Sequence, residues 1–324
     1  MATHRTGFQV YSRTRCHRSV TKPSEVGGIM AQSIGVIGLG AMGMGMARTL
    51  SAKGFAVAAY DLSPATMTKA AEAGIATLAT PAEVIAAGDV VVLSLPLASH
   101  VEATIEAGLA ADAFNEPKVI IDTSTSEAAV SRKLAAKLAD LGHGFLDAPV
   151  SGGPQGAAGG ALSVMLGGDA HWVAKAQPVL NAMAAKVIHV GPSGAGNIAK
   201  LVNNMLVACH MLTTAEGLRL AEAAGLPAED ALRVINSATG RSALSEVHFP
   251  NWVLSGSFDS GFSAGLMRKD VRLALELAQE SGCALPVSEL VAALWSEVRS
   301  GIGDNQDFML LGRLEAGAKE NANG

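Results

Sequence analysis

A glycine-rich segment has the residue types and spacing of a loop that binds phosphate groups: Gly38-Leu39-Gly40-Ala41-Met42-Gly43. It follows an apolar run and precedes a helical pattern, and Asp61 lies 23 residues after its first glycine, close to the ~20 residues expected of a dinucleotide-binding unit. In such units the first glycine makes a tight turn, the second admits the pyrophosphate, and the third lets helix and strand pack closely. The N-terminus of the following helix adds free N–H groups for the phosphates. The segment therefore predicts a dinucleotide-binding turn.

Asp61 bears on which dinucleotide would bind. It ends the second predicted strand, and its carboxylate can accept hydrogen bonds from the ribose hydroxyls of NAD. The same carboxylate would repel the additional phosphate of NADP, and no Arg follows it to offset the charge, since the next residues are Leu62, Ser63 and Pro64. The sequence therefore favours NAD over NADP.

A second segment offers groups suited to binding a carboxylate: Asp147-Ala148-Pro149-Val150-Ser151-Gly152-Gly153-Pro154. Directly after a predicted strand, Ser151 supplies a hydroxyl, and Gly152 and Gly153 supply backbone N–H groups that no side chain obstructs. Backbone N–H groups in such turns form anion-binding concavities. For this segment alone, an ordinary exit from a strand into a turn is the alternative.

A third group of residues lies on a long apolar helical pattern. Lys200 and Asn204 are four residues apart and so share one face of the helix. An ammonium group in a mostly apolar helix is costly unless it is paired or used. Burial would lower its pKa and let it exchange a proton near neutral pH, whereas the alternative is a lysine that extends to solvent. Gly196, one turn earlier, would leave room for a flat ring.

The elements around these motifs alternate between strands and helices. Short apolar runs with β-branched residues predict strands of a buried parallel sheet at 33–39, 55–61, 89–95 and 118–124, with helices near 41–53, 64–73, 81–88 and 98–108. Further strands at 144–150, 162–168 and 186–191 extend the sheet. Strands alternating with helices of this length indicate βαβ units and hence a Rossmann-type doubly wound sheet.

The pattern becomes purely helical after about residue 192. A stretch at about 195–224 contains no Pro and is apolar nearly all round, which predicts a long bridging helix buried on most sides. Helical periodicity continues from Pro227 and through 264–281 and 285–301. We therefore expect an NAD-binding Rossmann domain at 31–192 and an all-α substrate and dimerisation domain at 193–324.

Composition excludes several classes of function. Asp and Glu outnumber Lys and Arg by 29 to 24, and an acidic protein without a basic stripe is not typical of nucleic-acid binding. The Cys and His residues lack metal-ligand spacing, so we expect no metal site. The apolar runs are too short or too polar to span a membrane.

Residues 1–30 are basic and rich in Ser and Thr, which is typical of a mitochondrial presequence but also of a simple upstream extension. We therefore expect the protein in the cytoplasm or, if the segment is a presequence, in the mitochondrial matrix.

Together the three motifs resemble the β-hydroxyacid dehydrogenase family, which includes 3-hydroxyisobutyrate dehydrogenase and tartronate semialdehyde reductase. The resemblance runs from about Ser33 to Leu311. It implies that the turn from Gly38 to Gly43 binds the dinucleotide and that Ser151, Gly152 and Gly153 bind the substrate carboxylate. It also implies that Lys200 is the catalytic acid or base and that Asn204 binds substrate.

The resemblance implies further cofactor contacts. Leu95, Pro96 and Thr125 would lie beside the nicotinamide ribose, and Lys269 would reach the cofactor. His100 stands where relatives often have Asn, so its cofactor contact is a departure from the family pattern. A homodimer or homotetramer is also implied.

The expected function is hydride transfer between a small β-hydroxy acid and NAD, which gives the semialdehyde or oxo acid. The alternatives are reduction of tartronate semialdehyde (2-hydroxy-3-oxopropionate) and a non-enzymatic NAD-binding scaffold. A 6-phosphogluconate dehydrogenase would have His where Asn203 stands, and imine reductases on this scaffold replace the lysine found at Lys200. Substrate selectivity would come from residues within 237–250 and 262–270.

Overall fold

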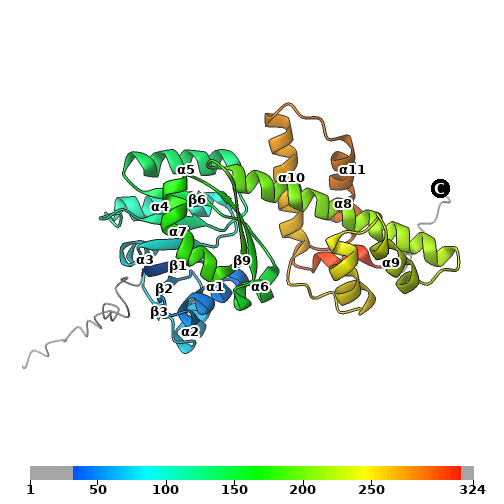
Figure 1. The fold of residues 1–324 in the computed structure, drawn as a ribbon, viewed down its shortest axis with the longest axis horizontal. Coiled ribbons are helices and arrows are strands. Elements are labelled where there is room, and N and C mark those ends of the chain that lie inside the picture. The colour runs from blue at the N-terminus through cyan, green and yellow to red at the C-terminus, as the bar shows by residue number, and fades with distance from the viewer. Residues whose placement is uncertain (1–31, 315–324) are drawn as a thin grey trace, which may run out of the picture. The chain divides into compact units, whose positions relative to one another are not determined.

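The N-terminal half of the chain forms one mixed sheet with helices on both faces (Figure 1). The computed structural model describes residues 32–314. The predicted extension or targeting segment at 1–30 therefore lies outside the described residues.

The sheet has nine strands in the order β3-β2-β1-β4-β5-β6-β8-β7, with β9 beside β8. The strands are β1 (Ser33–Ile37), β2 (Ala56–Tyr60), β3 (Ala76–Thr77), β4 (Val90–Leu93), β5 (Val119–Asp122), β6 (Gly144–Asp147), β7 (Val150–Ser151), β8 (Leu162–Gly167) and β9 (Ala184–Gly191). Pairing is parallel from β3 through β6, whereas β8 runs antiparallel to β6 and β7. The predicted Rossmann-type doubly wound sheet is confirmed.

One predicted strand is wrong in its extent. The run 144–150 divides into β6 and β7, and the pairing with β5 ends with the Ala148 N–H because Pro149 follows it. The Ala148 N–H donates to the carbonyl of Asp122 at 2.7 Å, and Pro149 has no N–H to donate. This break ends β6 at Asp147 and begins a new strand just before the Ser-Gly-Gly turn.

The central strands are apolar on both sides because two layers of helices cover them. Val90 and Val92 of β4 pack into a core beneath α1 and α7, whereas Val91 and Leu93 pack into a second core beneath α3, α4 and α5. The helices are α1 (Ala41–Ala52), α2 (Pro64–Glu72), α3 (Pro81–Ala87), α4 (Ala98–Ala110), α5 (Ala128–Asp140), α6 (Gly153–Gly159) and α7 (Ala170–Met183). The predicted helices correspond to α1 to α4, and α5, α6 and α7 add to them.

The long helix α8 (Ala195–Ala223) follows β9 as predicted and has 29 residues. Its predicted burial on most sides is wrong for the single chain. One stripe is buried, which includes Lys200, Asn204 and Met211, whereas the residues Val202 and Leu206 are 45% and 48% exposed. Apolar composition all round does not bury a helix when neighbouring elements cover only one of its faces.

The remaining elements are helical and pack around a second core. They are α9 (Ala228–Ser237), the π-helix η1 (Leu244–Leu254), α10 (Ala264–Glu280), α11 (Pro286–Trp295), α12 (Glu297–Ser300) and the 3₁₀-helix η2 (Phe308–Gly312). The largest buried side chains of this core are Trp295 and Phe249, and the Trp295 indole donates to the carbonyl of Ala208 on α8 at 3.1 Å. The all-helical second half is confirmed, although residues from Gln32 onward pack as one compact unit, so the domain boundary at 192/193 stays a prediction.

Within residues 32–314, no helix has the length and apolar character needed to cross a membrane. In the same range, no three His, Cys, Asp or Glu side chains gather closely enough to hold a metal ion.

Candidate active site

The glycine-rich turn between β1 and α1 is shaped for close approach of a ligand. Gly38 has a φ of +89°, where side chains are strained, and a Cβ at Gly43 would collide with the carbonyl group of Gly38. Gly40 is different, because a Cβ there would meet no protein atom within 4 Å. Gly40 also begins α1 without a side-chain cap, so the first N–H groups of the helix are available to an anion. The turn therefore fits the pyrophosphate of a dinucleotide.

Asp61 lies beside this turn. One oxygen of its carboxylate accepts a hydrogen bond from the Leu39 N–H at 2.7 Å, and the other accepts from the Ser63 N–H at 2.8 Å. Each carboxylate oxygen has a second lone-pair site, and the residue is only half-buried. The carboxylate is thus fixed at the end of β2 with acceptor capacity left for ribose hydroxyls.

The loops after β4 and β5 complete this edge of the sheet. The Ser124 hydroxyl accepts a hydrogen bond from the Leu95 N–H at 2.9 Å, and a Cβ on Gly38 would lie 2.9 Å from the Leu95 side chain. Leu95 is therefore next to the glycine turn. Pro96 and His100 are exposed, and within residues 32–314 the ring of His100 makes no hydrogen bond, so the structure does not bring His100 to the other candidate residues.

Lys269 connects the helical half to the loop after β5. Its ammonium group donates to the carbonyl of Thr125 at 2.7 Å and lies 3.3 Å from a carboxylate oxygen of Asp270. A pocket of about 290 Å³ is lined by residues of three segments: Leu97, Ala98, Ser99 and Glu102; Thr125, Glu127 and Val130; and Lys269, Arg272 and Leu273. Two of the predicted cofactor residues, Thr125 and Lys269, thus meet at one pocket.

Asp147 at the end of β6 anchors the start of α8. Its carboxylate accepts hydrogen bonds from the N–H groups of Gly194 at 2.7 Å and Asn197 at 3.0 Å. Gly196 packs against the backbone of Met165 and Asp147, so the prediction that Gly196 leaves room for a flat ring is wrong: the space is taken by the sheet. Burial raises the pKa of Asp147, against the effect of these hydrogen bonds.

A second carboxyl lies directly beside Asp147. Asp122 pairs with Asp147 in the register of β5 and β6. Burial raises the pKa of Asp122 to about 7, with hydrogen bonds from Ser124 acting in the opposite direction. The Asn197 side chain joins this region to α5, because its amide donates to the Ser131 hydroxyl at 2.9 Å.

Lys200 and Asn204 lie on the buried stripe of α8. Lys200 is 8% exposed, so the alternative of a lysine that extends to solvent is wrong. Burial lowers the pKa of Lys200, the negative charge of Asp270 raises it, and the positive charge of Lys269 lowers it. The Asn204 amide nitrogen donates to the second carboxylate oxygen of Asp270 at 2.6 Å. A buried amine and an amide therefore share one face with a Lys–Asp pair of α10.

The Ser-Gly-Gly turn is built from unusual backbone conformations. Gly152 has a φ of +125° and Gly153 a φ of +61°, values that favour glycine. The backbone of 260–261 lies over this turn, since a Cβ at Gly261 would be 3.2 Å from the Pro154 ring. Within residues 32–314, the Ser151 hydroxyl makes no hydrogen bond, so the structure does not join Ser151 to the other candidate residues.

Sequence reasoning did not assign roles to three polar residues that the structure places at the site. Asp147, Asn197 and Asp270 are buried and hydrogen-bonded to candidate residues or to the helix that carries them. The available signals were Asp147 at the end of a buried strand, Asn197 in the first turn of an apolar helix, and Asp270 next to Lys269. Each signal is weak because its meaning depends on a partner far away in the sequence.

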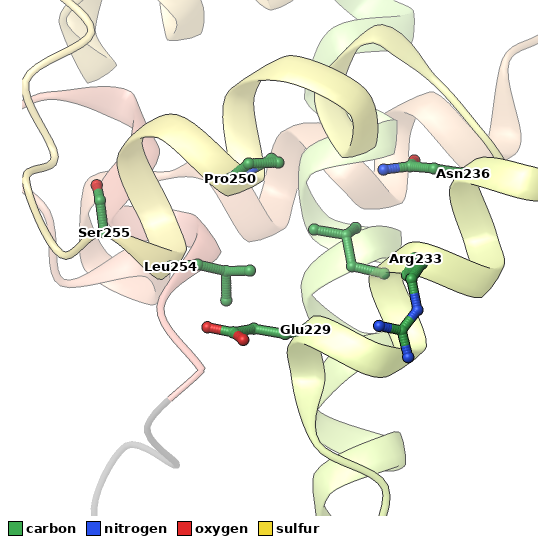
Figure 2. Close-up of a pocket in the computed structure, with 7 residues that line it drawn as sticks. Glu229, Arg233, Asn236, Pro250, Leu254 and Ser255 are labelled. Atoms are coloured by element: carbon green, nitrogen blue, oxygen red, sulfur yellow. The ribbon is translucent and has the colours of Figure 1, made fainter.

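Another pocket, of about 470 Å³, lies between α9 and η1 (Figure 2). Its lining comprises Glu229, Leu232, Arg233, Asn236, Pro250, Leu254 and Ser255. Pro250, at the end of the range 237–250 predicted to set selectivity, lines this pocket, whereas none of the predicted catalytic, carboxylate-binding or cofactor-binding residues does. The dinucleotide turn, the doubly wound sheet and a buried amine on an adjoining helix instead define an NAD(P)-dependent dehydrogenase.

Comparisons with known proteins identify the family. Residues 33–191 match the model for the NAD binding domain of 6-phosphogluconate dehydrogenase, and residues 194–314 match the model for the NAD-binding domain of NADP-dependent 3-hydroxyisobutyrate dehydrogenase. The chain is 37% identical to 2-(hydroxymethyl)glutarate dehydrogenase of Eubacterium barkeri, over 83% of this chain and 90% of that one. It is 35% identical to NAD-dependent L-serine dehydrogenase of Pseudomonas aeruginosa, over 87% and 97% of the two chains.

A solved structure agrees with these relatives. The 3-hydroxyisobutyrate dehydrogenase of Mycobacterium tuberculosis, solved with L-serine, has a TM-score of 0.81 and 35% identity, covering 89% of this chain and 100% of that one. The chain therefore belongs to the β-hydroxyacid dehydrogenase family and is an NAD-dependent hydroxyacid dehydrogenase. The resemblance stated from the three sequence motifs is confirmed.

Proposed function

We propose that this dehydrogenase oxidises a small acid with a hydroxymethyl group on the carbon next to the carboxylate, and that Lys200 takes the hydroxyl proton. The observation that carries the proposal is the buried amine of Lys200, which has a lowered pKa and lies on the same helix face as the hydrogen-bonded amide of Asn204. An amine with a pKa brought toward neutrality can accept or donate a proton at working pH.

The substrate class follows from what the named relatives have in common. Serine, 3-hydroxyisobutyrate and 2-(hydroxymethyl)glutarate, the compounds in their names, all carry CH₂OH next to a carboxylate-bearing carbon and differ in the third substituent. Oxidation of that group gives a semialdehyde. The residues within 237–250 and 262–270 remain our candidates for recognising the third substituent.

Each candidate residue has a role in this proposal. Ser151, Gly152 and Gly153 bind the substrate carboxylate through a hydroxyl and backbone N–H groups. Asn204 donates its remaining amide N–H to the substrate hydroxyl oxygen, and Lys200 accepts the hydroxyl proton. The cofactor held at the Gly38–Gly43 turn would supply the hydride acceptor for the substrate carbon. In the reducing direction, Lys200 returns the proton and stabilises the developing oxyanion, so reduction of tartronate semialdehyde uses the same groups in reverse.

We propose NAD as the preferred cofactor because of Asp61. Its fixed carboxylate favours ribose hydroxyls over the phosphate of NADP. The turn from Gly38 to Gly43 would bind the pyrophosphate, and Leu95, Pro96, Thr125 and Lys269 would lie around the nicotinamide ribose. His100 is the weakest member of this set, because it is exposed.

The assembly and the compartment are also proposals. The exposed apolar side chains of α8, which include Val202, Leu206 and Leu220, support a homodimer or homotetramer, because contiguous exposed apolar surface is typical of an interface. Light scattering coupled to gel filtration measures the oligomeric state. The cytoplasm or mitochondrial matrix stays a prediction, since residues 1–31 lie outside the described residues.

The experiment that tests the function is an NADH-formation assay on a panel of hydroxy acids. The panel contains 3-hydroxyisobutyrate, L-serine, 2-(hydroxymethyl)glutarate, glycerate, 3-hydroxypropionate and 4-hydroxybutyrate. We expect turnover on at least one acid with CH₂OH next to the carboxylate-bearing carbon and little on 4-hydroxybutyrate, whose hydroxyl is one carbon further from the carboxylate. Lys200→Ala should lower kcat by at least about a hundredfold while NAD still binds, because the proton acceptor is lost.

Two results would contradict the proposal. Full activity in Lys200→Ala would remove Lys200 from the chemistry. Tight NAD binding with no turnover on any acid or semialdehyde of the panel would favour the non-enzymatic scaffold.

A further inference from the structure

The Lys269–Asp270 ion pair lies next to Lys200 and is largely buried. The Asp270 side chain is 3% exposed and that of Lys269 is 15% exposed. Burying a carboxylate is costly unless it is paired and hydrogen-bonded. Asp270 has one oxygen hydrogen-bonded to Asn204, whereas its other oxygen lies 3.3 Å from the Lys269 ammonium and accepts no geometrically good hydrogen bond within residues 32–314. The structure retains this carboxylate at a cost, which points to a role beyond packing.

A chain of hydrogen bonds fixes the orientation of the Asn204 amide. The side-chain nitrogen Nδ2 of Asn203 donates to the side-chain oxygen Oδ1 of Asn204 at 3.1 Å. The side-chain nitrogen Nδ2 of Asn204 in turn donates to the Asp270 carboxylate at 2.6 Å. A carboxylate accepts hydrogen bonds only, so Asp270 requires the NH₂ side of Asn204 to face α10. The second N–H of that NH₂ group is then the donor that remains for a ligand beside Lys200.

The same carboxylate sets the charge around Lys200. The charges that act on Lys200 are the carboxylate of Asp270 and the ammonium of Lys269, both on α10. The charged and titratable residues on the other elements packed against the first half of α8 include Asp147 on β6, Arg132 on α5, and Lys186 and His189 on β9. Asp147 is engaged with the backbone at Gly194 and Asn197, and His189 with the carbonyls of Gly168 and Gly191. Within residues 32–314, Asp270 is therefore the carboxylate that acts on both Lys200 and Lys269, whereas Asp122 on β5 also acts on Lys269.

We propose that Asp270 is a positioning residue: its carboxylate orients the Asn204 amide toward the substrate hydroxyl and offsets the charge of Lys269, so that Lys200 alone exchanges the proton. The inference rests on the proposed function of Lys200. It assigns to Asp270 two separable effects, one of geometry through Asn204 and one of charge through Lys269.

Two variants separate these effects. Asp270→Asn keeps the shape and removes the charge, and Asp270→Glu keeps the charge and displaces the oxygens. Oxidation needs the unprotonated Lys200, so activity rises with pH through the Lys200 pKa. Because Asp270 raises that pKa, its loss lowers it, and we expect the acidic limb of kcat against pH to move down by about one pH unit in Asp270→Asn. In Asp270→Glu we expect an unmoved limb and a kcat lowered about tenfold by the displaced Asn204 amide.

The matched control is Asp304→Asn. Asp304 also pairs with a cation of α10, Arg268, but its side chain is 65% exposed, and we expect a wild-type limb and kcat. Thermal unfolding of all variants identifies any loss of folding. Should Asp270→Asn not fold, the kcat of Asp270→Glu still tests the geometric effect.

The charge effect would be overturned if the acidic limb of kcat against pH did not move in Asp270→Asn, or moved equally in Asp304→Asn. The geometric effect would be overturned if Asp270→Glu kept the wild-type kcat. Lys200→Ala distinguishes these failures from failure of the proposed function. If Lys200→Ala is inactive while the Asp270 variants behave as wild type, only the role of Asp270 is wrong. If Lys200→Ala keeps the acidic limb, Lys200 is not the titrating group and both proposals are wrong.

Discussion

The two halves of the candidate site present different chemical groups: backbone N–H groups in the sheet half and charged side chains in the helical half. In the sheet half, the dinucleotide turn works through backbone: Gly38, Gly40 and Gly43 remove side chains, and the start of α1 presents N–H groups. In the helical half, Lys200, Lys269 and Asp270 bring buried charges together. The sheet half thus offers a ligand space and backbone N–H groups, whereas in the helical half burial lowers the pKa of Lys200.

A matched pair of glycine variants gives the largest effect expected in the sheet half. Gly43→Ala places a Cβ against the carbonyl of Gly38, so we expect a loss of stability of about 1–3 kcal/mol together with lost NAD binding. Gly40→Ala meets no protein atom within 4 Å, so we expect wild-type thermal stability and an NAD dissociation constant raised about tenfold or more, about 1.4 kcal/mol.

Calorimetric titration with NAD and thermal melts measure both quantities. Wild-type NAD affinity in Gly40→Ala would contradict the role proposed for the glycine turn, because the space next to Gly40 would then not be where the pyrophosphate binds.

Asp61 is the exception in the sheet half, because there we expect a charged side chain to select the cofactor. Asp61→Asn keeps one carbonyl oxygen for the Leu39 N–H but removes the negative charge. We expect the ratio of kcat/KM for NAD over NADP to fall about tenfold, because a hydrogen bond to a charged group is lost for NAD and the repulsion of the NADP phosphate is relieved. Steady-state kinetics with both cofactors check this. An unchanged ratio would show that selectivity does not depend on this carboxylate.

Asp122 gives the smallest expected effect on activity and a clear one on stability. Its pKa is raised from 3.8 to about 7 by burial, so the folded protein binds a proton there that the unfolded chain has released. Stability should therefore fall as pH rises from about 4 to 7. Asp122→Asn removes this dependence and should be more stable than the wild type at pH 8, on the order of 1–3 kcal/mol.

Urea unfolding at pH 5 and pH 8 measures the difference between Asp122→Asn and the wild type. We expect a larger stabilisation at pH 8 than at pH 5. The same stabilisation at both pH values would mean that Asp122 does not change its protonation on folding in this range. The Asp147 carboxyl also has a raised pKa, and its charge acts on Asp122, so the measured difference belongs to the coupled pair of carboxyls.

The sequence predicted more of the site in the sheet half than in the helical half. The turn residues and Asp61 fall within one short βαβ unit, where each signal stands next to the strand or helix that gives it meaning. The role of Asp270 could not be predicted from neighbouring residues, because its hydrogen-bond partner Asn204 is 66 residues away in the sequence. Gly196 shows the converse error: a local interpretation assigned it space for a ligand, and the sheet occupies that space.

By itself, the sequence determined the alternation of strands and helices, the dinucleotide turn, a lysine within a long apolar helix and, through three motifs in order, the family. These features are local, and periodicity and backbone conformation follow from neighbouring residues. Only the tertiary structure decided which face of α8 is buried, how Asp147 anchors its first turn, and which charges surround Lys200. Burial and electrostatics depend on groups brought together from distant parts of the chain, and no spacing within one segment encodes them.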